Sequence, residues 1–355
     1  MNKSPTRSGA GLAILAAVLF GITTPIAKRL LGEMSSIMLA GVFYLGSGIG
    51  LGFCMLGRKV LSHSDGEQET SLKGTDFPWL IIAVVTGGLL APVLLMIGLA
   101  KTPASTASLL LNLEAVFTAL LAWFVFREHV HRQMAIGMFL IAIGGILVSW
   151  TGRPQSGAIG GTLLIAAACL CWAIDNNFTR KVSSSDPFQI AAIKGGVAGL
   201  VNCGIALSLG NRLPLPATLL LAGIVGFLGY GLSLVLFILA LRRIGTARTV
   251  AYFSTAPFIG AIISVVLFAE PITAWIITAG LLMGVGVWFH LTERHEHLHA
   301  HEELVHDHLH AHDEHHQHDH DAKTSTGEPH SHLHRHARLV HSHSHYPDTH
   351  HRHDH

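Results

Sequence analysis

One acidic side chain, Glu114, lies deep inside a long apolar run of this sequence. It stands near the middle of residues 104–126, and Asn112 precedes it by two positions. A charge in hydrocarbon is costly, so a carboxylate at this depth is expected to face protein or a water-filled cavity. Because removal from water favours the protonated form, Glu114 is a candidate for proton coupling or for binding a cation. The alternative is a protonated Glu that only joins two helices by hydrogen bonds.

A second polar group belongs to two further apolar runs. Asp175 and Asn176 lie near the end of residues 158–178, and Lys194 lies about two turns into residues 187–209. The second of these runs starts on the side of the membrane where the first one ends. Asp175 and Lys194 are therefore predicted at similar depth, where they can form an ion pair. The pair is either structural or a cytoplasmic gate that breaks when a cavity opens inward.

The elements that position these residues are predicted to be membrane-spanning helices. Of the 355 residues 50% are hydrophobic and only 13% are charged, whereas a soluble protein carries about 25% charged residues. A helix needs about 20 apolar residues to cross the hydrocarbon core. The sequence contains ten such runs, at residues 9–31, 35–57, 77–100, 104–126, 133–150, 158–178, 187–209, 215–241, 245–268 and 273–290. The predicted fold class is an all-α polytopic membrane protein with ten transmembrane helices.

The ten runs divide into two related halves of five. Placing Glu128 on Glu270, a shift of 142 residues, aligns AVFTALLAWFVFREHVHRQMAIGMF with PFIGAIISVVLFAEPITAWIITAGL. Placing Phe20 on Trp172, a shift of 152 residues, aligns FGITTPIAKRL with WAIDNNFTRKV. Five spans per half insert the second half upside down relative to the first, as in many transporters. We expect a first five-helix repeat at residues 1–153, a second at residues 154–292, and a separate tail at residues 293–355.

This pattern resembles the EamA-type transporters of the drug/metabolite transporter superfamily. The resemblance covers about residues 10–290 and consists of Gly, Pro and Trp positions and a Glu at a helix end. It implies a ten-helix carrier in which helices 1, 3, 4, 6, 8 and 9 surround a substrate cavity. Many members have Pro where this chain has Ala115, so Glu114 stands where the chain departs from their general pattern. Two threonines of the first helix are included because they align with Asp175 and Asn176. The predicted substrate and proton-coupling cavity contains Glu114, Asn112, Asp175, Asn176, Thr23, Thr24 and Lys194.

The distribution of Lys and Arg among the loops predicts the orientation of the chain. If the N-terminus is cytoplasmic, the inside segments before the tail carry 12 of these residues and the outside loops carry 5. This bias agrees with the positive-inside rule. Ten spans return the C-terminus to the cytoplasm. We therefore expect a multi-pass protein of the plasma (inner) membrane with both termini cytoplasmic.

Charged residues near the helix ends are assigned structural roles. Glu128 and Glu270 each precede the next helix, where an acid satisfies exposed backbone N–H groups and complements the helix dipole. Lys28 and Arg29 lie at the outer end of the first helix. They are expected to snorkel to the headgroups, with attraction of an anionic substrate as the alternative.

Small residues four positions apart predict close contacts between helices, because they let two backbones approach each other in lipid. The pairs are Gly46/Gly50, Gly48/Gly52, Gly195/Gly199 and Gly280/Gly284.

The chain ends in a low-complexity tail that is rich in histidine. Of the 27 His residues, 23 lie in residues 291–355. Histidines two apart share a face of an extended chain and those four apart share a face of a helix, so either geometry can bind Zn²⁺, Ni²⁺, Cu²⁺ or Co²⁺. The tail lacks a core of apolar residues and is predicted to be disordered until metal binds, with a pH-sensitive polyelectrolyte as the alternative role. The predicted metal ligands are His295, His297, His299, His301, His306, His308, His310, His312, His316, His318, His320, His332, His334 and His336.

These features favour a secondary-active, proton-coupled carrier of a small solute with a metal-binding tail. The alternative is a divalent transition-metal (Zn, Ni or Co) carrier that uses the tail as buffer or sensor. Metal transport needs several converging ligands, and the membrane part offers only Glu114 and Asp175, with no intramembrane His. A membrane-anchored metal store needs a single span, so the ten runs argue against it.

Enzymatic activity is not expected. The sequence has no nucleotide-binding loop and no nucleophile–base constellation. No cofactor is required, although a divalent transition metal (Zn, Ni, Co or Cu) is expected to bind the tail. The expected partners are the lipid bilayer, a small-molecule or ion substrate and, in a homodimer, a second copy of the chain, but no nucleic acid.

Overall fold

The computed structural model describes most of the membrane part of the chain and four segments of its tail. The described residues are 5–61, 72, 74–125, 132–150, 158–182, 186–244, 246–292, 296–301, 304–310, 330–336 and 339–344. The chain forms two compact units, Met1–Glu293 and Arg294–His355.

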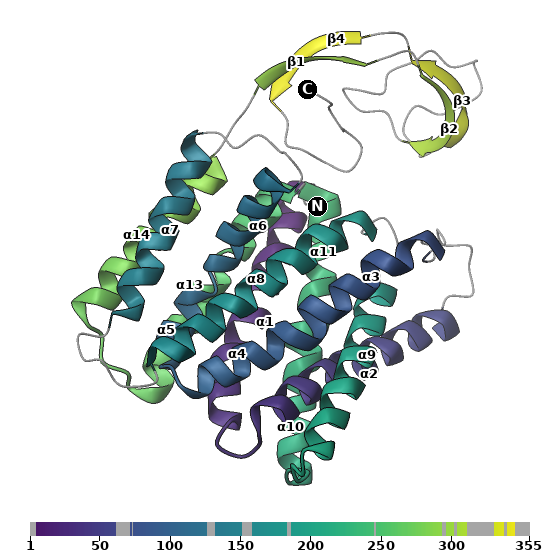
Figure 1. Ribbon diagram of the computed structural model, residues 1–355. Helices are drawn as coiled ribbons and strands as arrows, with labels where there is room; N and C mark the ends of the chain where they lie inside the picture. Colours follow the sequence, from purple (N-terminus) through teal and green to yellow (C-terminus); the bar gives the residue numbers. More distant parts are fainter. Residues whose placement is uncertain are drawn as a thin grey trace. The chain divides into compact units, whose positions relative to one another are not determined.

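The regular elements that the structure describes in the first unit are all helical (Figure 1). The elements before residue 153, here called the first half, are α1 (Pro5–Leu30), α2 (Ser36–Leu61), the 3₁₀ turn η1 (Gly74–Asp76), α3 (Phe77–Ala83), the π-helix η2 (Val84–Leu90), α4 (Ala91–Ala100), α5 (Ala104–Leu110), α6 (Leu113–Phe124) and α7 (Arg132–Ser149). Those after residue 153, the second half, are α8 (Ala158–Val182), α9 (Pro187–Ser208), α10 (Pro216–Gly226), the π-helix η3 (Phe227–Leu232), α11 (Ser233–Ile244), α12 (Thr246–Phe253), α13 (Ala256–Phe268) and α14 (Ala274–Thr292).

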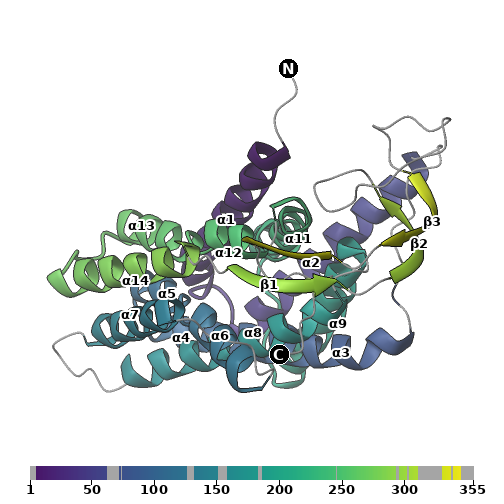
Figure 2. The same ribbon diagram turned by 90° about the horizontal axis from the view of Figure 1, so that it is seen from above.

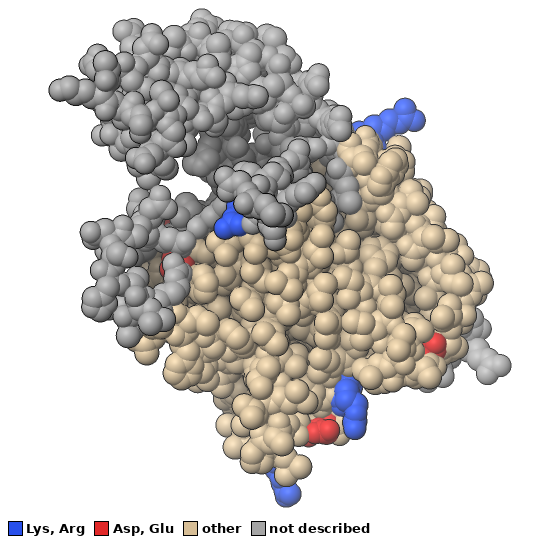
Figure 3. Space-filling model, turned by 180° about the vertical axis from the view of Figure 1, so that it is seen from behind, with Lys and Arg blue, Asp and Glu red and all other residues tan. Residues whose placement is uncertain are grey.

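The composition of the helices indicates a lipid environment. Among the described residues, 8 helical segments are long and apolar enough to cross a membrane, and two shorter apolar helices follow at Ala256–Phe268 and Ala274–Phe289. Large apolar side chains point outward, among them Phe53 with 70% and Val266 with 78% of its surface exposed. On the described part of the face in Figure 3, charged side chains lie near the ends of the bundle and a broad uncharged surface separates them. An apolar surface of this extent is expected to contact lipid.

The two halves interlock. The first helix of the first half, α1, packs against α11, α12 and α13 of the second half. The first helix of the second half, α8, packs in the same way against α3, η2, α4 and α6. At opposite edges of the bundle α2 pairs with α9 and α7 pairs with α14 (Figures 1 and 2). Residues far apart in sequence therefore meet along α1 and α8.

Regular α-helix is interrupted at equivalent places in the two halves. The π-helices are η2 and η3, and the breaks lie at Leu111–Asn112 and Ser254–Thr255. Each interruption of the first half recurs about 142 residues later, the shift that relates the two halves in sequence. The apolar runs 104–126 and 245–268 were predicted as continuous helices and are each broken in two. In the second run the break precedes Pro257, which has no N–H to bond to the preceding turn.

Glycines allow the helices to approach closely in the α2–α9 contact. A Cβ built on Gly48 would overlap the backbone of Gly196, and one built on Gly195 would lie 2.6 Å from the backbone nitrogen of Gly48. The predicted close contact is therefore present at Gly48 and Gly195. It is absent at Gly52, Gly280 and Gly284, where an added Cβ would meet nothing within 4 Å among the described residues.

Replacing Gly48 by Ala is expected to lower the stability of the protein by about 1–3 kcal/mol, because the added methyl group forces α2 and α9 apart. Gly52→Ala on the same helix is the matched control. It meets no atom and should leave stability unchanged or raise it by up to about 1 kcal/mol through helix propensity. Thermal unfolding of the purified protein in detergent measures both effects, and equal melting temperatures for the two variants would contradict this packing.

In the described segments of the second unit there are four strands (Figure 1). Strand β1 (Glu296–His301) pairs with β4 (Leu339–Ser344), and β2 (Leu304–His310) pairs with β3 (His330–His336), both antiparallel. The membrane part is helical, as predicted, and the described tail segments, which were predicted to be disordered until metal binds, are paired strands. Histidine recurs at alternate positions of these strands, and alternate side chains of an extended chain share one face. Strand pairing satisfies the backbone N–H and C=O groups without a large apolar core.

Candidate functional site

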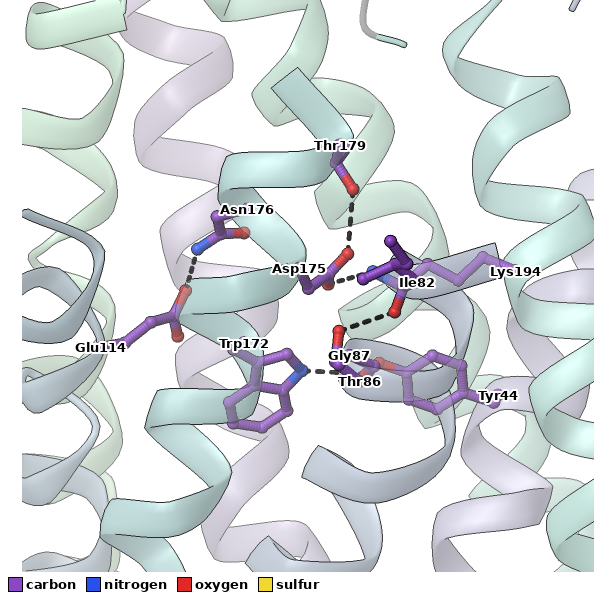
Figure 4. Close-up of polar contacts among 10 residues, drawn as sticks. All are labelled: Tyr44, Ile82, Thr86, Gly87, Glu114, Trp172, Asp175, Asn176, Thr179 and Lys194. Atoms are coloured by element: carbon purple, nitrogen blue, oxygen red, sulfur yellow. Dashed lines mark hydrogen bonds and ion pairs between the residues drawn. The ribbon is translucent and has the colours of Figure 1, made fainter. Parts of the chain in front are cut away.

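The centre of the site is a hydrogen bond between helices of the two halves (Figure 4). The Asn176 side chain, near the end of α8, donates through Nδ2 to Oε1 of Glu114 in α6 at 2.7 Å. Glu114 is half-buried and Asn176 is exposed, so the described helices do not fully enclose the pair. The second carboxylate oxygen of Glu114 has no hydrogen-bond partner among the described residues.

The break before α6 determines how Glu114 is presented. The turn is closed by bonds from Glu114 N to Leu111 O, at 3.1 Å, and from Ala115 N to Asn112 O, at 3.2 Å. Glu114 thereby becomes the second residue of α6. The N–H groups of Glu114 and Ala115 are paired within this turn and are not available to the carboxylate. No Lys or Arg of the described residues bonds to the Glu114 carboxylate.

The predicted ion pair between Asp175 and Lys194 is present beside this centre (Figure 4). Nζ of Lys194 donates to Oδ2 of Asp175, and the Thr179 hydroxyl donates to Oδ1 at 2.9 Å. The side chains of Asp175 and Lys194 are 5% and 9% exposed. Gly87 is packed against the carboxylate so closely that a Cβ there would overlap it. Asp175 is thus neutralised and points away from Glu114 (Figure 4).

The π-helix η2 provides a free backbone acceptor next to the ion pair. The N–H of Ala91 bonds to the carbonyl of Thr86, five residues earlier, and not to that of Gly87. The Gly87 oxygen instead accepts from the Tyr44 hydroxyl at 2.6 Å and from Nε1 of Trp172 at 3.1 Å. Through this carbonyl the irregular turn η2 joins α2 and α8 next to the ion pair.

Aromatic rings form the wall next to the Glu114–Asn176 pair. Trp172 lies one turn before Asn176 on α8, and the Phe20 ring of α1 is 6.3 Å from it. The same Phe20 ring lies 5.8 Å from Tyr230 and 5.5 Å from Phe253. Phe20 and Phe253 are half-buried, whereas Trp172 and Tyr230 are buried. The site therefore combines one acid and one amide with aromatic surface from both halves.

Three residues predicted to line the cavity are buried in helix contacts. Thr23, Thr24 and Asn112 are each 2–3% exposed. The Thr23 hydroxyl and the Asn112 amide each donate to the backbone carbonyl three residues earlier, at 2.6 and 3.0 Å. The structure does not bring them into hydrogen-bond contact with Glu114.

Sequence reasoning did not identify Tyr44, Phe20 or Gly87 as part of the site. Aromatic and glycine residues in apolar runs more often indicate packing than function. The sequence did contain one clue to Gly87: the 142-residue shift aligns it with Gly229, so glycine occupies the same position in both halves. Gly229 lies in the other π-helix, η3.

Lys28 binds the end of α4. Its Nζ donates to the carbonyl oxygens of Leu99 at 2.6 Å, Thr102 at 2.8 Å and Ala100 at 3.4 Å. The prediction that Lys28 snorkels to the headgroups is wrong, because the last carbonyls of a helix lack intrahelical partners and lie within its reach.

Glu270 binds the start of α5, directly after the same turn. Its Oε1 accepts from Ala104 N at 2.8 Å, and its Oε2 accepts from Ser105 N at 3.0 Å and from the Ser105 hydroxyl. The predicted capping role is confirmed, but the capped helix is α5 of the other half and not the following α14. Glu128 lies outside the described residues. We call Lys28, Glu270 and the segment 99–105 between α4 and α5 the turn clamp.

The part of the membrane unit that the structure describes has no metal-binding cluster, since no three His, Cys, Asp or Glu side chains come together there. The predicted tail ligands His295, His312, His316, His318 and His320 lie outside the described residues. The other predicted ligands lie in strands β1, β2 and β3.

The helical fold, the apolar surface and the partly open acid–amide pair define a polytopic membrane protein suited to carrying small solutes. The chain belongs to the EamA-like transporter family, which matches residues 7–150 and 159–292. It is therefore a membrane transporter of small solutes.

Individual relatives agree with this family. An "Uncharacterized transporter" of Methanothermobacter thermautotrophicus is 30% identical over 286 residues, which cover 78% of this chain and 83% of that one. A "Probable amino-acid metabolite efflux pump" of Escherichia coli is 26% identical over 306 residues, covering 81% and 95%. One of Salmonella typhimurium is 26% identical over 307 residues, with the same coverage. A solved crystal structure with a TM-score of 0.59 and 16% identity covers 79% of this chain and 95% of its own, and shares the fold.

Proposed function

We propose that this chain is a secondary-active, proton-coupled carrier that moves a small solute across the inner membrane. The observation that carries the proposal is the Glu114 carboxylate, which lies in a membrane-spanning segment and bonds to Asn176 through one oxygen. A charge without a counter-ion is costly at this depth. The acid therefore takes up a proton when the space beside it is empty and releases the proton when a cationic solute enters. Asn176 orients the carboxylate toward that space.

The solute is proposed to carry an amino group. An ammonium ion can donate to the unpaired oxygen of Glu114 and neutralise it, while the rings of Phe20 and Phe253 offer apolar and cation–π contacts for the remainder. The names of the two enterobacterial relatives, which refer to amino-acid metabolites, support this class. Since proton and amine then compete for one carboxylate, the expected reaction is antiport, in which one proton moves inward as one amine moves outward.

The architecture proposed for this function has ten spans in two inverted five-helix repeats, at residues 1–153 and 154–292. The reciprocal packing of α1 and α8 and the interruptions repeated after about 142 residues support it. The two shorter apolar helices, α13 and α14, complete the ten, with α12 extending the ninth span. The excess of Lys and Arg in alternate loops supports cytoplasmic termini.

Proteoliposomes that contain the full chain and an internal pH dye test this function. A panel of labelled amino acids is added outside, and each compound is followed by its uptake and by the accompanying proton movement. We expect at least one compound to exchange with protons in opposite directions. A proton movement of zero for every transported compound contradicts the coupling, and the absence of any transport in the panel contradicts the amine class.

A carrier for a divalent transition metal, with the tail as buffer or sensor, is the second candidate. The register of the tail strands favours a metal role: His297 lies opposite His343 and His299 opposite His341. Between strands β2 and β3 the residues directly opposite each other include His306 and His334, His308 and His332, and His310 and His330. Directly opposite residues of an antiparallel pair have Cβ atoms about 4.5–5.5 Å apart and share one face. Such histidine pairs suit Zn²⁺ or Ni²⁺, which take imidazole ligands.

Zinc titration of the full chain, compared with a version that ends at Arg294, measures the role of the tail. We expect zinc binding at pH 7.5 to be at least about tenfold weaker in the shorter version, and binding to the full chain to weaken as the pH falls below about 6.5, because protonated His cannot bind metal. Metal tolerance of cells that carry the full chain, the shorter version or Glu114→Gln separates buffering from transport. If neither change alters metal handling, the metal-carrier function is excluded.

A further inference from the structure

The turn clamp holds the two halves together at one end of the bundle. Glu270 belongs to the second half, and the α5 N–H groups that it caps belong to the first. Along the same stretch α5 packs against α13. This contact is close, since a Cβ built on Gly260 would lie 3.3 Å from the Cβ of Ser108, which is 0% exposed. The end of the bundle at the turn clamp is therefore closed.

The opposite end lacks the equivalent contact. The repeat shift of 142 residues places α5 on α12 and α6 on α13, so the counterpart of the α5–α13 contact is one between α12 and α6. In the described residues α12 packs against α1, α11 and α14 and has no comparable contact with α6. Glu114 at the start of α6 and Asn176 on α8 border this less closely packed region. The two halves are related in sequence, but the α5–α13 contact is close and the described residues form no comparable α12–α6 contact.

A carrier built from related halves can exchange these two arrangements and so reverse which end is open. We propose that the turn clamp is the latch of the closed end. Glu270, just after α13, holds the N-terminus of α5, and Lys28 fixes the turn that precedes α5. The site becomes accessible from that end when Glu270 leaves the N-terminus of α5. The latch rests on the proposed carrier function, and it assigns to Lys28 and Glu270 a conformational role separate from proton or solute binding.

The chemistry of the latch suits repeated release. Lys28 and Glu270 are half-buried, so water can replace their bonds to the backbone when the end opens. The closed packing also leaves the hydroxyls of Thr102 and Ser108 buried without a hydrogen-bond partner among the described residues. Opening hydrates both hydroxyls, which offsets part of the bonds lost at Glu270. The free-energy difference between the closed and the open arrangement is thereby reduced.

A cysteine placed behind the latch reports its opening. Ser108→Cys is labelled with a membrane-impermeant maleimide, added to either face of membrane vesicles, and the labelled peptide is quantified by mass spectrometry. The parent chain without Ser108→Cys gives the background from its four cysteines. We expect slow labelling of Cys at this position when Glu270 is present, and a rate about tenfold higher from one face with Glu270→Gln, because the neutral amide is a weaker acceptor for the α5 N–H groups.

Two further variants make the result specific. Lys28→Gln should also raise the labelling rate, since it loosens the other side of the same turn, and it replaces Glu270→Gln if that variant does not fold. Glu33→Gln is the matched control: Glu33 follows α1 at this end and accepts from the Thr218 hydroxyl at 2.6 Å, but makes no bond to the turn clamp. Its labelling rate should equal that of the parent.

The latch is refuted if Glu270→Gln and Lys28→Gln, both eluting as intact protein, label at the parent rate, or if Glu33→Gln matches them. The labelling needs no transported solute. If Glu270→Gln raises the rate but no compound is transported, the latch stands and the carrier function fails. If transport is seen and the rate is unchanged, the carrier function stands and the latch fails.

Discussion

Replacing Glu114 by Gln is expected to abolish proton-driven accumulation of solute while solute exchange continues. In one-for-one exchange a pH difference of about one unit can sustain up to about a tenfold solute gradient, because both correspond to about 1.4 kcal/mol. Gln has nearly the same shape as protonated Glu and can keep a bond to Asn176, but it cannot release a proton. The accumulation ratio should therefore fall from about tenfold to about one, while labelled and unlabelled solute still exchange across the membrane.

Proteoliposomes with an imposed pH difference measure accumulation, and counterflow without a pH difference measures exchange. Glu33→Gln is the matched control, because it removes an acid that lies between helices α1 and α2 and outside the site. It should leave both activities at the parent level. A pH-driven gradient that survives in Glu114→Gln would show that another group carries the proton.

Replacing Lys194 by Met is expected to destabilise the protein by about 3–5 kcal/mol, because it leaves the Asp175 carboxylate buried and unpaired. The side chains are 5% and 9% exposed, so water cannot take the place of the ammonium group without disturbing the packing. Combining Lys194→Met with Asp175→Asn should recover most of the loss, since neither charge then remains. Thermal unfolding in detergent, followed by intrinsic fluorescence, compares the single and the double variant.

The exposed ion pair of Arg29 and Glu33 provides the contrast. These side chains are 69% and 42% exposed, and their charged atoms are 3.9 Å apart. Arg29→Met should cost only about 0–1 kcal/mol. A similar loss in Arg29→Met and Lys194→Met would mean that burial does not govern the contribution of these pairs. Failure of the double variant to recover would mean that the lysine stem, and not its charge, supports the packing of α9.

The sequence identified the charged members of the site because few polar side chains occur at membrane depth. Glu114 stood out as an acid in an apolar run, and the positions of Asp175 and Lys194 in consecutive runs predicted their pairing. The choice of Asn176 as the partner of Glu114 did not follow from the sequence. It depends on the packing of α6 against α8, which joins residues 62 positions apart in the chain.

Local irregularities of the helices were harder to predict. The apolar run 104–126 gives no sign of the break at Leu111–Asn112, because every residue in it is compatible with a helix. The break arises where short-range backbone bonds replace the regular pattern. The same holds for Gly87, whose free carbonyl oxygen is created by the π-helical turn and used by Tyr44 and Trp172 from two other helices.

By itself the sequence determined that this chain is a helical membrane protein with two related halves and a histidine-rich tail, because hydropathy and internal repetition are properties of the linear chain. Only the tertiary structure decided which groups meet. In the structure Glu270 caps α5 instead of α14, and Lys28 binds the end of α4. The side chains of Asn112 and Thr23 bond to backbone carbonyls three residues earlier and not to Glu114. Hydrogen bonds between distant segments depend on how helices pack and where they break, and side-chain spacing along one chain does not contain that information.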